Sequence, residues 1–152
     1  MLRSVAILLV LLAAPAASSA QSLKGVWIME ESRVIGGPND GQITEFNRPR
    51  FLIYTDAFFM WAFVGNGERP TGDLTDAQIV QAVSQYNSVG GTYIRDGATI
   101  RYNQVVSMNP NISLPENQPM VREIRTLTAN RLVTQATNAE GVTTLNIYRR
   151  VE

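Results

Sequence analysis

Short runs of apolar and β-branched residues, separated by turn residues, make up most of the chain from residue 25 onward. This pattern is typical of an all-β sandwich or barrel. We predict eight strands from these runs. Their expected ranges are 25–33, 50–55, 58–64, 91–95, 98–106, 121–128, 131–137 and 143–150.

The turns between these runs predict how consecutive strands pair. Asp96-Gly97 is the type of two-residue turn that best matches the twist of a β-hairpin. Turn residues at Ala129-Asn130 and at 138–141 join the last three runs, which we therefore expect to form a meander. A polar loop that contains three prolines precedes this meander.

One segment departs from the β pattern. Ile79, Val80 and Val83 recur at helical spacing, and Thr75 with Gln78 forms a capping box, so we predict a helix over 75–87. This helix lies between the third and fourth predicted strands. Because the run 58–64 is apolar on both faces, we expect the apolar side of the helix to cover its outer face.

Eight antiparallel strands on so short a chain need a way to avoid exposed edges. An up-and-down barrel pairs every edge, so we predict an eight-stranded antiparallel barrel with one helix. The interior of a barrel of this size is either filled by side chains or holds one small ligand.

The N-terminal segment has the features of an export signal. Arg3 precedes an unbroken apolar run over 5–14, and Ser18-Ser19-Ala20 offers a cleavage site of small residues. Pro15 and the serines argue against an uncleaved membrane span, which needs about 20 mainly apolar residues. We therefore predict a signal peptide over 1–20, a barrel domain over 21–152, and a secreted or periplasmic protein without a stable membrane anchor.

Composition excludes several kinds of chemistry. The chain contains no Cys and no His, which excludes disulfides, thiolate nucleophiles, zinc sites built on these residues, and Ser-His catalysis. Lys and Arg number 13, as do Asp and Glu, and no basic stripe is present. We therefore predict no nucleic-acid partner, no metal and no cofactor.

Several short motifs resemble those of a known family. Gly25-Val26-Trp27 is similar to the Gly-x-Trp signature of lipocalins and other calycins, and the whole segment 23–152 resembles the bacterial lipocalin-like domain family. The other matching features are the apolar strand pair 49–64, Gly91-Thr92-Tyr93, Asn109-Pro110, Arg122 and Tyr148-Arg149. That family often has a His in the strand where this chain has Tyr102-Asn103, so this chain cannot use such a His.

The resemblance implies a barrel closed at one end and a ligand held inside it. Trp27 is expected to stack on a late-strand arginine, Arg149 or Arg150, in a structural role. The candidate ligand-binding residues are aromatic, apolar or basic residues of the predicted strands. They are Tyr54, Met60, Trp61, Phe63, Tyr93, Tyr102 and Arg122.

Each of these candidates has a structural alternative. Alternation alone does not fix which strand face points inward, and the aromatic residues can all belong to a packed core. Arg122 can lie on a solvated face or in an internal ion pair, or it can anchor an acidic group.

The sequence leaves three functions open. We favour a protein that binds a small apolar or weakly acidic molecule over an enzyme, and we expect no catalytic residue. The alternatives are a cofactor-free isomerase or cyclase that uses the same cavity, and a filled barrel that acts in protein–protein interaction.

Overall fold

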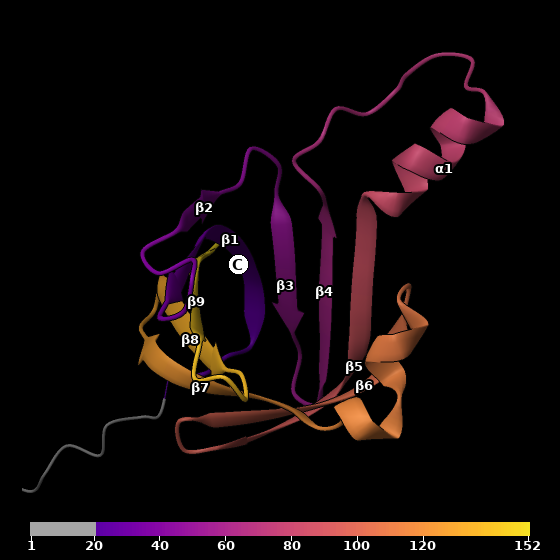
Figure 1. Cartoon of the computed structure of the whole chain (residues 1–152). Coiled ribbons are helices and arrows are strands. Elements are labelled where there is room, and N and C mark those ends of the chain that lie inside the picture. The colour runs from indigo at the N-terminus through magenta and orange to yellow at the C-terminus, as the bar shows by residue number, and fades with distance from the viewer. Residues whose placement is uncertain (1–20) are drawn as a thin grey trace, which may run out of the picture.

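The computed structural model describes residues 21–152, and the predicted export signal lies outside the described residues. Within 21–152 the chain forms nine strands, one α-helix and two short 3-10 helices (Figure 1). Their order and bounds are β1 (Gly25–Ile35), β2 (Ile43–Glu45), β3 (Arg50–Tyr54), β4 (Phe58–Val64), α1 (Asp76–Ser84), β5 (Tyr86–Asp96), β6 (Thr99–Ser107), η1 (Pro110–Ser113), η2 (Pro115–Asn117), β7 (Met120–Leu127), β8 (Arg131–Thr137) and β9 (Thr143–Arg150).

The strands form one antiparallel sheet, and eight of them close into a barrel (Figure 1). Consecutive strands from β3 to β9 pair with one another, and β1 pairs with both β3 and β9. The predicted hairpin across Asp96-Gly97 and the meander of β7 to β9 are both present. The predicted all-β barrel of eight strands is therefore confirmed.

The short strand β2 is not among the strands predicted from the sequence. It pairs only with the second half of β1, at Glu31 to Arg33. Three residues are too few to show an alternating pattern. Because β2 precedes it, the helix lies between β4 and β5 and not between the third and fourth strands as predicted.

The helix α1 is shorter than predicted. Thr75 is its N-cap and forms the predicted capping box with Gln78, but the helix ends at Ser84 with Gln85 as its C-cap. Tyr86 and Asn87, which the sequence analysis gave to the helix, begin β5. No helix in residues 21–152 is long and apolar enough to cross a membrane.

The helix does not cover the outer face of β4, so that prediction is wrong. It extends away from the barrel wall beyond the ends of β4 and β5 (Figure 1), and Ile79, Val80 and Val83 are 46%, 68% and 52% exposed. On the outer face of β4, Phe58 and Met60 are 60% and 50% exposed. The described chain therefore leaves two apolar surfaces in contact with water.

One end of the barrel is closed by Trp27, which is fully buried. Its Nε1 donates a hydrogen bond to the Leu23 carbonyl at 2.8 Å. The guanidinium carbon of Arg150 lies 4.1 Å from the centre of the Trp27 ring. Of the two arginines proposed for this stack, Arg150 makes it, whereas Arg149 points outward and pairs with Glu30 at 3.1 Å.

Steric crowding explains why glycine occupies the first position of the Gly-x-Trp signature. Gly25 adopts a φ of +135°, and a Cβ atom there would lie 2.2 Å from the Glu152 carbonyl oxygen and 2.5 Å from Arg150 Nη1. A side chain at this position would therefore displace the last residues of the chain from the closed end.

The loop between β6 and β7 completes the barrel wall near its other end. Pairing between these strands ends at Tyr102 and Met120. Beyond that point the Gln118 side chain accepts a hydrogen bond from the Gln104 backbone N–H at 3.0 Å and donates one to the Ile112 carbonyl at 3.0 Å. The loop thereby fixes the strand segments that carry Gln104 and Met120.

Candidate ligand-binding site

The inner wall formed by β3, β4 and β5 consists of three rows of side chains. Residues opposite one another in antiparallel strands point to the same face of the sheet. Because Tyr54, Leu52 and Phe59 are buried, this shared face is the lumen. From the closed end upward the rows are Tyr54–Phe59–Gly91, Leu52–Trp61–Val89 and Arg50–Phe63–Asn87.

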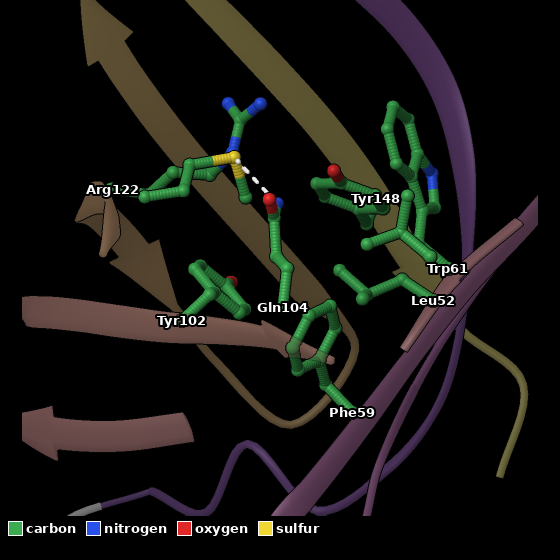
Figure 2. Close-up of a pocket in the computed structure, with 9 residues that line it drawn as sticks. Leu52, Phe59, Trp61, Tyr102, Gln104, Arg122 and Tyr148 are labelled. Atoms are coloured by element: carbon green, nitrogen blue, oxygen red, sulfur yellow. Dashed lines mark hydrogen bonds between the residues drawn. The ribbon is translucent and has the colours of Figure 1, made fainter. Parts of the chain in front are cut away.

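The middle of the lumen contains a small cavity (Figure 2). Figure 2 shows side chains that converge on it from several strands, with Arg122 and Trp61 on opposite sides in this view. The space between the lining atoms is about 340 Å³ including its opening to solvent, but the centre of a water-sized sphere reaches only about 20 Å³ of it. This is little more than the space that one water molecule needs. The lining residues are Leu52, Phe59, Trp61, Val89, Tyr102, Gln104, Met120, Arg122 and Tyr148.

Two hydrogen-bond donors in this cavity lack a partner. Trp61 Nε1 and Arg122 Nη1 are both buried and neither forms a hydrogen bond within the described residues. No Asp or Glu of residues 21–152 lines the cavity. Buried donors without partners are costly, most of all on a charged group. The cavity is therefore suited to a group that accepts hydrogen bonds and carries negative charge.

The floor of the cavity is formed by tyrosines that remain neutral. The hydroxyls of Tyr54 and Tyr102 hydrogen-bond to each other, and the Tyr102 ring meets the Phe59 ring edge-on at 4.7 Å between centres. Burial raises the pKa of Tyr102 well above 10. Burial, together with the neighbouring Tyr102, also raises the pKa of Tyr54 well above 10. At neutral pH both are protonated, so the floor is apolar with one internal hydrogen bond.

Tyr148, on β9, lines the cavity from the wall that faces β3, β4 and β5. Burial raises the pKa of Tyr148, and the positive charge of Arg122 partly opposes this rise. Next along β9, Asn146 is buried and its Oδ1 accepts a hydrogen bond from the Ser32 hydroxyl at 3.0 Å. The wall formed by β9 and β1 thus also contributes buried polar groups.

Comparison with solved structures identifies the architecture. A lipocalin-like protein from Bacteroides uniformis superposes with a TM-score of 0.52 at 15% identity, over 84% of this chain and 97% of that chain. An uncharacterized protein from Bacteroides eggerthii gives a TM-score of 0.50 at 13% identity, over 85% and 99% of the two chains. The chain has a lipocalin-like fold. This confirms the resemblance predicted from the sequence at the level of the fold.

Comparison of the sequence alone identifies no relative. No protein family model and no curated protein matches the chain. At identities of 13% and 15% the likeness concerns the lipocalin-like barrel and carries no ligand from one protein to another.

The lipocalin-like barrel brings three of the predicted ligand-binding residues to the cavity: Trp61, Tyr102 and Arg122. Phe63 also belongs to the lumen-facing positions and lies one row above Trp61, with 4.9 Å between the ring centres. Tyr54 is buried beneath the cavity and reaches it through Tyr102.

Two predicted residues lie away from the cavity. Met60 is on the outer face of β4 and half exposed. Tyr93 packs edge-on against Tyr54 at 4.9 Å, and its hydroxyl donates to the Thr55 carbonyl at 2.7 Å near the closed end. Neither residue lines the cavity that contains Arg122.

The sequence analysis missed six residues that line the cavity of the lipocalin-like barrel. Leu52 and Phe59 share the inward parity of Tyr54 and Trp61, so alternation would have found them once one inward residue was known. Gln104 and Met120 depend on the β6–β7 loop, which has no periodic signal. The complete set is Leu52, Phe59, Val89, Gln104, Met120 and Tyr148.

Proposed function

We propose that this chain binds, in the lumen of its barrel, a small and mainly apolar molecule that carries one acidic group. The observation behind this proposal is that two buried donors without partners, Arg122 Nη1 and Trp61 Nε1, belong to one cavity with mainly aromatic and aliphatic walls. Such a combination of apolar walls and a few convergent polar groups is typical of small-molecule sites.

The acidic group is the part of the ligand that Arg122 would hold. Arg122 is not part of any ion pair within residues 21–152. A carboxylate between Arg122 and Trp61 would accept hydrogen bonds from both donors and offset the cost of burying an unpaired cation. A hydrogen bond to a charged group contributes about 1.5–3 kcal/mol.

The ligand requires more room than the cavity offers with its side chains in their present positions. Met120 is the side chain best suited to move, because it is unbranched and flexible. Its Sδ accepts only one weak hydrogen bond, from Gln104 Nε2 at 3.4 Å. We therefore expect Met120 and Gln104 to change rotamer on binding.

The test compares octanoate with octanol, which share a chain but differ in charge. Binding is measured by isothermal titration calorimetry and by tryptophan fluorescence, to which Trp61 in the cavity contributes. We expect octanoate to bind about tenfold or more tightly than octanol, and Arg122→Met to remove this preference. Arg125→Met is the matched control, because Arg125 lies on the same strand but is exposed on the outer face.

The outcomes separate the possibilities. Equal binding of octanoate and octanol would mean that Arg122 does not anchor the acidic group. Loss of the preference in Arg125→Met as well would point to net charge rather than to the cavity. If neither compound binds and native mass spectrometry of gently purified protein shows no bound molecule, the lumen is a packed core.

A packed core would favour the second candidate, a barrel that acts in protein–protein interaction. The narrow cavity and the exposed apolar outer face of β4, with Phe58 and Met60, favour this candidate. It predicts that Met60→Glu weakens association with a protein partner, whereas lumen variants that keep the fold leave this association unchanged.

We also propose that the chain is exported and cleaved after Ala20. Arg3, the apolar run over 5–14 and the small residues before Gln21 support this. N-terminal sequencing of protein recovered from the envelope or medium is expected to begin at Gln21. A full-length form in the membrane fraction would contradict cleavage.

A further inference from the structure

A second arginine, Arg50, stands at the open end of the lumen. It occupies the upper row with Phe63 and Asn87, at the inward parity of Leu52 and Tyr54. Its guanidinium carbon lies 3.8 Å from the centre of the Phe46 ring and 4.3 Å from the centre of the Phe63 ring. These contacts hold the guanidinium in one orientation.

The hydrogen-bonding capacity of Arg50 is not used. Its Nε is buried without a partner, and Arg50 forms no ion pair within residues 21–152. Burial lowers the pKa of Arg50, although the group remains charged at neutral pH. Because the N–H groups of a guanidinium lie in its plane, rings against its faces leave its edge for hydrogen bonds.

The two arginines are separated by two aromatic rings. The Phe63 ring touches Arg50 on one side and lies 4.9 Å from the Trp61 ring on the other, and Trp61 lines the cavity that contains Arg122. A guanidinium thus stands at each end of this apolar stretch. Within residues 21–152, no Asp or Glu lines the cavity that contains Arg122, and Arg50 stands outside the lining of that cavity.

We propose that Arg50 is a second anion anchor and that the lumen takes a dicarboxylate with an apolar body, one carboxylate at Arg122 and the other at Arg50. This inference rests on the proposed function, because it assigns Arg122 the same role. The Nε edge of Arg50 would bind its carboxylate in the plane of the guanidinium through two parallel hydrogen bonds. Phe63 and Trp61 would cover the apolar body.

The experiment compares dicarboxylates with monocarboxylates of equal chain length by isothermal titration calorimetry at neutral pH. The probe pairs are suberate with octanoate and succinate with butyrate. We expect suberate to bind about tenfold more tightly than octanoate, since it alone meets both arginines. Succinate is expected to bind only slightly more tightly than butyrate, because its chain is too short to reach from Arg122 past the Trp61 and Phe63 rings to Arg50.

Variants locate the effect. Arg50→Gln is expected to bring the affinity ratio of suberate to octanoate close to one. Arg50→Lys keeps the charge but lacks the planar edge, so it is expected to keep only part of the preference. Arg101→Gln removes one positive charge from the exposed outer face of β6 and is expected to keep the full ratio.

Each outcome decides the inference. Equal affinities of suberate and octanoate in the native protein overturn it, as does an unchanged ratio in Arg50→Gln. Octanoate binding that depends on Arg122, without any gain for suberate, removes the second anchor but leaves the proposed function standing. If neither suberate nor octanoate binds, both proposals fall. Should Arg50→Gln not fold, Arg50→Lys and the native probe series still decide.

Discussion

The guanidinium of Arg150 lies over the Trp27 ring, and its N–H groups donate hydrogen bonds to the carbonyls of Ser22 at 2.8 Å and Ala129 at 2.7 Å. A third hydrogen bond reaches the carbonyl of Lys24. One side chain from the last strand therefore joins the N-terminal segment, the first strand and the β7–β8 turn. This contact holds the closed end of the barrel together.

The first prediction concerns this closure. Trp27→Ala is expected to lower the free energy of unfolding by about 3–5 kcal/mol, because it removes a fully buried indole. Arg150→Met is expected to cost about 1.5–3 kcal/mol through its lost hydrogen bonds. Denaturant unfolding followed by circular dichroism measures both.

The neighbouring arginine provides the control for that measurement. Arg149 pairs with Glu30 on the exposed surface, so Arg149→Met is expected to cost only about 0–1 kcal/mol. Equal losses in the Arg149 and Arg150 variants would show that the stack on Trp27 contributes nothing specific.

The fold was predictable from sequence where a local rule dominates. The turn Asp96-Gly97 fixed a hairpin, and the Thr75–Gln78 capping box fixed the start of α1. The end of α1 was not predictable, because Tyr86 continues the helical spacing although it belongs to β5 and pairs with Val64 of β4. That choice depends on tertiary pairing, which overrides local periodicity.

The site was predictable only in part. Aromatic composition pointed to β4, but the same run offered two parities, and only the closed barrel shows that Trp61 and Phe63 face inward while Met60 faces water. Arg122 was one candidate among several, because the sequence left open a solvated face, an internal ion pair and an inward anchor. Arg50 begins its strand and gave no signal, because its contact with the ring of Phe46, a loop residue, exists only in the folded chain.

The second prediction concerns the helix. Thr75→Ala removes the capping box and is expected to destabilise α1 by about 1 kcal/mol. Because Ile79, Val80 and Val83 are exposed, this loss is expected to be local. Hydrogen exchange in α1 should accelerate while the unfolding midpoint of the barrel stays the same, and Thr71→Ala in the preceding loop should change neither.

The third prediction concerns alkaline pH. Burial raises the pKa of Tyr54, Tyr102 and Tyr148 above the usual value of 10. As pH rises past about 10 these groups lose protons in the unfolded chain but not in the folded one, so the free energy of unfolding falls by up to about 1.4 kcal/mol per pH unit for each. Below that pH their contribution is constant.

Denaturant titrations on both sides of this pH measure the slope. Tyr148→Phe removes one of the tyrosines whose pKa burial raises, and it is expected to make the alkaline loss of stability shallower. Tyr86→Phe is the comparison, since Tyr86 is 42% exposed, and it is expected to keep the slope of the native protein. An identical slope in both variants would contradict the assignment to buried tyrosines.

The last prediction uses the two faces of β4, where adjacent residues have opposite surroundings. Trp61→Phe keeps an aromatic ring in the lumen but removes the buried Nε1 donor, so octanoate is expected to bind about threefold to tenfold more weakly by calorimetry. Met60→Gln changes a half-exposed side chain on the outer face and is expected to alter neither octanoate binding nor stability by more than about 0.5 kcal/mol. If Met60→Gln weakened binding as much as Trp61→Phe, the loss would not be specific to the lumen side of β4. If neither variant changed the affinity, octanoate would bind away from β4, and the proposal that Trp61 and Arg122 together donate hydrogen bonds to one ligand group would be wrong.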